Sequence, residues 1–191
     1  MNCNGQRFMN ESFAGLVLAQ SCRQPINPEA KMVGNFAIMD SKYMSYIQAG
    51  GLDHGAPNWG FPEGIEEFQA QMAAADPAAG TVEVCGLEIA NRTSPFVNEI
   101  FVGATLEDAL KNAGLEGEAL ENAKASVERY NELCAAGKDT DFGKPENLLI
   151  PIDEGPFFVA TQGTNKLYGP GLNTLAGLCV NGDYQVLPAS K

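Results

Sequence analysis

The chain has 191 residues, of which 45% are hydrophobic and 19% charged, as expected for one packed globular domain or a domain with a small lobe. Its formal net charge of −12 argues against binding nucleic acid, because the phosphates would be repelled at long range. No apolar run reaches about 18 residues, so no membrane span is predicted. The five cysteines are odd in number and contain no C-x-x-C motif. Neither a disulfide framework nor a zinc site is indicated, and we expect small buried thiols.

Short helices and one strand are predicted in the first third of the chain. Glu11–Cys22 carries apolar side chains at helical spacing, and Asn35–Met39 is a short apolar run typical of a buried strand. Asp40 or Ser41 can cap the short helix that follows. A proline in the first turn and glutamates near the start predict a helix over Pro62–Ala75.

Strand and helix signals alternate in the middle of the chain. Thr81–Val84 and Glu99–Val102 have the composition of strands. Thr105 is placed to cap a helix whose first turn is acidic, and Gly114 ends that helix after about two turns.

A long helix is the strongest signal, and it is predicted over Glu116–Ala136 with Gly137 as its left-handed terminator. Its apolar residues step by three and four and form one stripe: Leu120, Ala123, Val127, Tyr130 and Cys134. Three more strands are predicted over Phe157–Thr161, Leu178–Val180 and Gln185–Leu187, with an Asn-Gly-Asp hairpin turn between the last two. The elements together predict an α+β fold with short mixed strands and one long helix.

The common catalytic motifs are missing from the sequence. It contains neither G-x-G-x-x-G nor a Walker loop, so nothing in it predicts a phosphate cradle. His54 is the single histidine, so neither a histidine-based triad nor a metal site is predicted. The acids of the D-T-D-F-G stretch, Asp139 and Asp141, lack the bidentate glutamate of a calcium loop, so local turns explain them better and no metal is predicted.

Six segments occur in an order that is similar to one known family. They are G-Q-R-F-M-N-E, N-F-A-I-M-D, A-T-L-E-D-A-L, S-V-E-R-Y-N-E-L-C-A-A-G-K-D-T-D-F-G-K, G-P-F-F-V-A and N-T-L-A-G-L-C-V-N. Together they resemble the FAD-dependent fumarate reductase family, which includes urocanate reductases and, more distantly, ketosteroid dehydrogenases. The resemblance covers both ends and the middle of the chain.

The resemblance implies a cap domain that closes over the flavin and encloses the substrate. Residues 1–35 would be the linker from the FAD domain and the first cap helix, and residues 36–150 the cap, with an insertion at about 47–102. Residues 151–191 would hold the return strands toward the FAD domain. The chain is then expected to be an excised cap region that is inactive alone and binds no FAD. Its partners would be the FAD-binding domain of its own parent chain and a small-molecule substrate. The compartment stays open, cytoplasmic or exported, because any signal peptide would lie upstream.

The chemistry implied for the parent protein is hydride transfer from FAD to an activated C=C bond, followed by protonation of the other carbon. The family's proton-donating and relaying arginines are missing after Asp40 and Glu11, and Asn173 stands where a substrate-binding histidine is expected. Without these cationic clamps, fumarate itself is not the expected substrate. Tyr43 is the first candidate for the acid and Lys42 the second. The alternative for Tyr43 is packing on the core with its hydroxyl in water.

The remaining site residues follow from the same resemblance. Expected substrate-binding residues are Glu11, Asn173 and Thr174. Expected cofactor-binding residues are Arg7, Asn10, Leu175, Ala176 and Gly177. A structural alternative stands beside several of these roles: Arg7 and Glu11 can pair with each other, Asn173 can cap a turn, and Tyr130 can simply pack on the buried stripe.

Two other functions stay open at this point. One is a flavoenzyme similar to ketosteroid dehydrogenase, which removes hydrogen instead of adding it. The other is a stand-alone binding domain without a redox role. A G-x-G-x-x-G motif upstream in the parent gene would favour the enzyme, because that motif binds the pyrophosphate of FAD.

Overall fold

The structure is a computed structural model, and it describes residues 1–12, 24–25, 27, 34–50, 70–84, 88–89, 92–93 and 98–161. Predictions that fall elsewhere lie outside the described residues. These are His54, most of the helices predicted over Glu11–Cys22 and Pro62–Ala75, the strands after residue 161, and the predicted site residues Asn173, Thr174, Leu175, Ala176 and Gly177.

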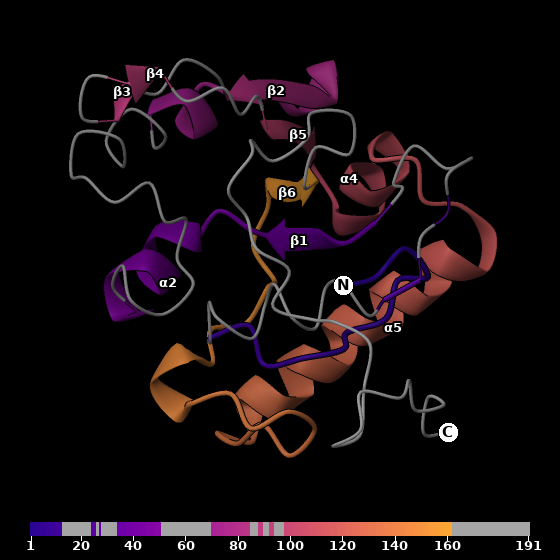
Figure 1. The fold of residues 1–191 in the computed structure, drawn as a ribbon, viewed down its shortest axis with the longest axis vertical. Coiled ribbons are helices and arrows are strands. Elements are labelled where there is room, and N and C mark those ends of the chain that lie inside the picture. Colours follow the sequence, from indigo (N-terminus) through magenta and orange to yellow (C-terminus); the bar gives the residue numbers. More distant parts are fainter. Residues whose placement is uncertain are drawn as a thin grey trace, which may run out of the picture.

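A four-stranded antiparallel sheet forms the centre of the described part (Figure 1), with strands in the order β1-β6-β5-β2. The strands are β1 (Phe36–Met39), β2 (Thr81–Val84), β5 (Asn98–Gly103) and β6 (Phe157–Thr161). All three pairings are antiparallel, and Phe101 of β5 stands opposite Val159 of β6. A separate two-stranded pair consists of β3 (Glu88–Ile89) and β4 (Arg92–Thr93). The α+β fold is therefore confirmed.

The helices are α2 (Tyr43–Gly50), α4 (Leu106–Asn112) and α5 (Gly117–Ala135). Residues 70–73 are also helical, and two short 3₁₀ turns, η1 and η2, cover Pro77–Ala79 and Glu146–Leu148. The start of α4 agrees with the sequence: Thr105 accepts a hydrogen bond from the backbone N–H of Asp108 at 3.1 Å and so caps the helix.

Side chains on the two faces of the sheet alternate between two apolar clusters, as the two-residue period of a strand requires. Phe101 and Val159 pack with α4 and the start of α5 on one face. Ile100, Val102 and Phe158 pack with Met72 and α2 on the other. The sheet is thus covered by helices on both sides. The strand predicted over Asn35–Met39 is thus present as β1, the last strand of the sheet on one side, but of its residues only Phe36 is fully buried.

Helix α5 follows the prediction closely and differs at one residue. Its buried residues are Leu120, Ala123, Val127, Tyr130 and Leu133. Cys134 is only half-buried, so its place in the stripe was predicted wrongly. Positions three and four residues beyond Tyr130 share one helix face, and the larger apolar leucine takes the buried place. Cys3 is half-buried too, so the expectation of buried thiols is wrong for both described cysteines.

The end of α5 directs the chain into the loop that carries the candidate site. Gly137 has φ 67° and donates from its N–H to the Cys134 carbonyl at 3.0 Å, while the N–H of Lys138 reaches the Leu133 carbonyl at 3.2 Å. These two bonds form a Schellman motif, which ends the helix at the predicted glycine.

The N-terminal segment lies along α5 (Figure 1) and is bonded to it in two places. Ser126 donates its hydroxyl to the Gly5 carbonyl at 2.8 Å, and the Asn122 amide donates to the Asn4 carbonyl at 3.1 Å. Residues 7–12 are thereby placed beside the loop that follows α5.

Candidate functional site

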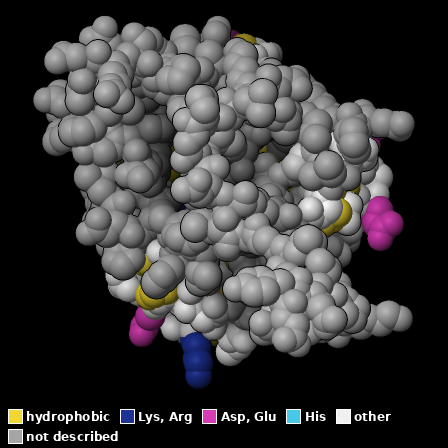
Figure 2. Space-filling model, viewed as in Figure 1, with side chains coloured by type: hydrophobic (Ala, Val, Ile, Leu, Met, Phe, Trp, Pro, Cys, Tyr) yellow, Lys and Arg dark blue, Asp and Glu magenta, His cyan; other side chains and the backbone are white. Residues whose placement is uncertain are grey.

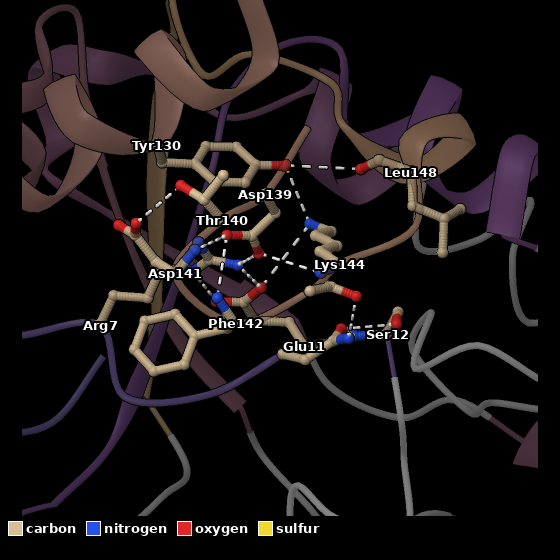
Figure 3. Close-up of polar contacts among 12 residues, drawn as sticks. Arg7, Glu11, Ser12, Tyr130, Asp139, Thr140, Asp141, Phe142, Lys144 and Leu148 are labelled. Carbon is tan, nitrogen blue, oxygen red and sulfur yellow. Dashed lines mark hydrogen bonds and ion pairs between the residues drawn. The ribbon is translucent and has the colours of Figure 1, made fainter. Parts of the chain in front are cut away.

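Two groups of side chains contain the described residues that the sequence marked as functional, apart from Asn10. The first is named the Arg7 cluster and the second the Asp40 turn. The Arg7 cluster consists of Arg7, Glu11, Tyr46, Tyr130, Asp139, Phe142 and Lys144, most of which Figure 3 shows. The Asp40 turn consists of Asp40, Lys42, Tyr43 and Asp153.

Arg7 is the centre of its cluster and is 9% exposed. Its Nε and Nη2 donate to the two carboxylate oxygens of Glu11 at 2.7 and 2.9 Å, and Nη2 also donates to Asp139 at 2.7 Å. The guanidinium lies over the rings of Tyr130 and Phe142, at 5.1 and 5.0 Å from their centroids. The pairing of Arg7 with Glu11 that the sequence left open is therefore present, while the predicted cofactor and substrate contacts of these two residues stay predictions.

Asp139 orders the loop after α5. Its carboxylate accepts from the backbone N–H groups of Asp141, Phe142 and Lys144, each at 3.0 Å, as well as from Arg7. The interpretation as a local turn is therefore confirmed for Asp139, whereas the Asp141 carboxylate pairs with Arg129. Although burial acts in the opposite direction, Arg7 and the backbone hydrogen bonds hold the pKa of the Asp139 carboxyl well below its usual range.

Lys144 closes the same loop, and its ammonium group is buried. Nζ donates to the Tyr130 hydroxyl at 2.9 Å and lies 3.8 Å from a carboxylate oxygen of Glu11. It also lies over the ring of Tyr46, 4.6 Å from the centroid. Burial lowers the pKa of Lys144 and raises the pKa of Tyr46 to about 12. The sequence reasoning missed Lys144, although it directly follows the D-T-D-F-G stretch.

Tyr130 and its neighbour Asn131 connect α5 to the segment that leads into β6. Tyr130 is 6% exposed, and its hydroxyl donates to the Leu148 carbonyl at 3.4 Å. The side chain of Asn131 donates to the Ile152 carbonyl at 2.9 Å and accepts from the Ile152 N–H at 2.8 Å. The predicted packing of Tyr130 is thus confirmed, and its hydroxyl also accepts a hydrogen bond from Lys144.

The Asp40 turn joins the start of α2 to the same segment before β6. Buried Asp40 accepts from the backbone N–H of Lys42 at 2.9 Å and from those of Asp153 and Glu154 at 3.0 and 3.1 Å. The Lys42 ammonium is 3.3 Å from Asp40 and pairs with Asp153. Although burial opposes the change, the hydrogen bond to Asp153 and the charge of Asp40 raise the pKa of Lys42.

Tyr43 begins α2 and packs edge-on against Phe158, with ring centroids 6.2 Å apart and planes at 80°. The tyrosine is half-buried, and this burial raises the pKa of its hydroxyl. The packing that the sequence offered as an alternative for Tyr43 is present in the structure. Its catalytic role stays a prediction.

The structure brings Arg7 and Glu11 together and connects them to α2. The contacts run from Glu11 to Lys144 and from Lys144 to Tyr46, which lies one helical turn after Tyr43. Asn10 donates its amide to the Gly143 carbonyl at 3.0 Å, and its oxygen accepts from the Ser12 hydroxyl at 2.6 Å. Arg7 and Asn10 thus both bond to other residues of this chain. Their role in binding the cofactor stays a prediction.

A shallow open groove of 420 Å³ lies elsewhere, along α5. Leu106, Val127, Ile152 and Phe157 form its apolar part. Asp153 of the Asp40 turn also lines this groove, but none of the predicted catalytic, substrate-binding or cofactor-binding residues does. The Arg7 cluster and the Asp40 turn are therefore the better candidate site. On the face drawn in Figure 2, the described side chains form only small hydrophobic patches and isolated charges. No helix in the described ranges is long and apolar enough to cross a membrane.

Comparison with known proteins finds distant similarity to reductases. No protein-family model matches the chain. A stretch of 80 residues, 41% of this chain, is 35% identical to the fumarate reductase (cytochrome) of Shewanella frigidimarina, of which it covers 13%. Over 201 aligned residues, 98% of this chain, it is 26% identical to the vinyl phenol reductase of Lactiplantibacillus plantarum, of which it covers 32%. The chain thus spans less than a third of the length of either relative.

Proposed function

We propose that this chain is the substrate-capping region of a flavin-dependent oxidoreductase that reduces an activated C=C bond. The observation that carries the proposal is the similarity to a vinyl phenol reductase along 98% of this chain. The second relative is a reductase of another alkene, fumarate. In the parent protein, FAD would be held by a separate domain, since this sequence lacks a glycine-rich phosphate-binding motif.

The cations of the candidate site favour a substrate without two carboxylates. Arg7 is paired with Glu11 and Asp139, and Lys42 with Asp40 and Asp153. Lys144 is buried and lies 3.8 Å from the Glu11 carboxylate. Binding a dicarboxylate needs charge-assisted hydrogen bonds from cations that are not already paired. We therefore propose an uncharged or singly charged alkene conjugated to an aromatic ring or a carbonyl, such as a vinyl phenol, in place of fumarate.

The chain's own residues would enclose this substrate and supply its proton, while bound reduced FAD supplies the hydride. Tyr43 is the proposed proton donor, at the turn between β1 and α2. The two ion pairs of Lys42 fix its ammonium at the Asp40 turn, which favours Tyr43 over Lys42. Glu11 is proposed to contact the substrate, because its carboxylate is 41% exposed while its partner Arg7 is buried.

The substrate class can be tested on the full-length protein that carries this chain. Its flavin is reduced, vinyl phenol or fumarate is added, and flavin reoxidation is followed spectroscopically. We expect fast reoxidation by vinyl phenol and none above background by fumarate. Faster reoxidation by fumarate would contradict the proposed substrate class, and no reoxidation by either alkene would contradict the proposed reaction.

The role of Tyr43 is tested by the Tyr43→Phe variant in the same assay. Loss of a general acid lowers a rate by about 10²–10⁴-fold, so reoxidation by vinyl phenol should slow by that factor. Reduction of the flavin by its electron donor should be unchanged, because that half-reaction needs no proton from Tyr43. Reoxidation at the unmodified rate would exclude Tyr43, and Lys42→Met would then be tested in its place.

A further inference from the structure

Lys144 is enclosed by aromatic rings at the centre of the Arg7 cluster. Its side chain is 6% exposed, and Nζ lies 4.6 Å from the ring centroid of Tyr46 and 4.8 Å from that of Tyr130. The hydroxyl of Tyr130 accepts a hydrogen bond from Nζ at 2.9 Å. Two ring faces and one hydroxyl therefore hold the ammonium in one place, since cations bind favourably to aromatic faces.

The charges of the cluster direct Lys144 toward Glu11. Among the described residues the cluster contains two cations, Arg7 and Lys144, and two carboxylates, Glu11 and Asp139. Asp139 is already occupied by Arg7 and by three backbone N–H groups. Glu11 is the carboxylate that Lys144 approaches, with Nζ 3.8 Å from Oε2.

Glu11 is also the member of these ion pairs that reaches the surface. Its side chain is 41% exposed, against 9% for Arg7, 6% for Lys144 and 0% for Asp139. Arg7 contacts both oxygens of the Glu11 carboxylate, and Lys144 approaches the second of them. The buried cations Arg7 and Lys144 thus hold the partly exposed carboxylate of Glu11 on its protein-facing side.

We propose that Lys144 is a positioning residue, which holds the Glu11 carboxylate in the orientation that contacts the substrate. The proposal rests on the proposed function, in which Glu11 meets the alkene. Without the ammonium, Arg7 alone holds the carboxylate, and Glu11 gains freedom to turn. A small misplacement of a contact group can cost up to about a hundredfold in an enzymatic rate or affinity.

A double-mutant cycle in the full-length protein tests the proposal. KM and kcat for vinyl phenol are measured for Lys144→Met, Glu11→Gln and the double variant. Lys144→Met should raise KM about tenfold with a much smaller change in kcat. The double variant should have the KM of Glu11→Gln alone, because Lys144 acts only through that carboxylate. Lys138→Met, which changes an exposed lysine of the same loop, is the matched control and should leave KM unchanged.

Additive effects of the two substitutions on KM would overturn the proposal, since they would show that Lys144 does not act through Glu11. If Lys144→Met does not fold, Tyr130→Phe replaces it in the cycle. This variant removes the hydroxyl that binds Nζ and keeps the ring. It should raise KM when Glu11 is present and leave KM unchanged when Glu11 is already replaced by glutamine. Wild-type protein without turnover would contradict the proposed function. Melting temperatures of the same single and double variants would then test the Lys144–Glu11 contact alone. Additive shifts in melting temperature would show that the two side chains do not interact and would overturn the contact.

Discussion

At the scale of single residues, Arg7 and Arg129 make similar bonds in different surroundings. Both form a two-pronged ion pair with a carboxylate, Arg7 with Glu11 and Arg129 with Asp141. Arg7 is 9% exposed and also holds the fully buried carboxylate of Asp139, whereas Arg129 is 50% exposed. The loss of stability on removing one partner of an ion pair increases with burial, because the remaining charge is left desolvated and unpaired.

Arg7→Met should therefore lower the free energy of unfolding by about 3–5 kcal/mol, because the Asp139 charge stays buried without its cation. Arg129→Met is the matched control, and it should cost less than about 1 kcal/mol, as an exposed pair does. Both values can be measured by urea unfolding of the 191-residue chain. Equal costs for the two variants would mean that the Arg7 cluster is open to solvent.

The Asp40 turn contains the two candidate proton donors, and sequence and structure give different information on them. The sequence ranked Tyr43 first and Lys42 second as candidates, although both follow Asp40 within three positions. The structure separates their contacts: Lys42 pairs with Asp40 and Asp153, and Tyr43 packs on Phe158. Asp153 lies 111 residues beyond Lys42, so no local pattern could have indicated that pair.

At the scale of elements, helix α5 is the frame on which the N-terminal segment and the loop after α5 are placed. Val127, at the middle of its buried stripe, is 2% exposed. Val127→Asp would put an unpaired charge into that stripe and should lower the free energy of unfolding by several kcal/mol.

Ala125→Asp introduces the same side chain on the exposed face of the same helix and is the matched control. Helix propensity limits its cost to about 0.7 kcal/mol. The two variants are compared by thermal unfolding of the chain. A melting temperature of Val127→Asp within a degree or two of that of Ala125→Asp would contradict the burial of the stripe.

The contact between the N-terminal segment and α5 depends on the missing side chain of Gly5. This glycine has φ 77°, and a Cβ on it would lie 2.2 Å from the Ala119 carbonyl oxygen and 2.6 Å from the Ala123 nitrogen. Both neighbours are helix backbone and cannot move aside cheaply. Gly5→Ala should therefore detach the segment and displace Arg7 from Asp139.

The matched control is Gly143→Ala, because Gly143 has a similar φ of 71° and nothing within 4 Å of an added Cβ. It should cost only the backbone strain, about 1–2 kcal/mol. Urea unfolding of both variants measures the difference, and Gly5→Ala should cost clearly more than Gly143→Ala. Equal costs for the two variants would show that the close approach is absent.

At the scale of the whole molecule, helices cover both faces of one antiparallel sheet, and the candidate site lies where the N-terminal segment, α2 and the loop after α5 meet. The proposed function assigns flavin binding to another domain of the parent protein. The purified 191-residue chain should then be colourless, since pyrophosphate contacts usually supply much of the affinity for a dinucleotide.

An absorption spectrum of the purified chain, with and without added FAD and after desalting, checks this expectation. The full-length protein is the positive control and should keep its flavin. A yellow chain with near-equimolar flavin after desalting would contradict the assignment of this chain as a cap region.

The sequence by itself determined the elements whose ends depend on neighbouring residues. Thr105 and Gly137 limit two helices through hydrogen bonds to backbone groups a few positions away, and the bounds of α4 and α5 were predicted accordingly. The α+β class follows from the same local signals. The pairing of Arg7 with Glu11 was also foreseen as an alternative, since the two residues carry opposite charges and lie close in the sequence.

Only the tertiary structure decided which side chains meet around that pair. Arg7 reaches Asp139 across 132 positions of sequence, and Lys144 lies between a tyrosine from α2 and another from α5. Such contacts depend on how sheet, helices and loop pack in three dimensions, and the free energy of that packing is distributed over the apolar clusters on both faces of the sheet. Local periodicity contains no information on it, so the sequence named Glu11 as a site residue and missed the buried lysine beside it.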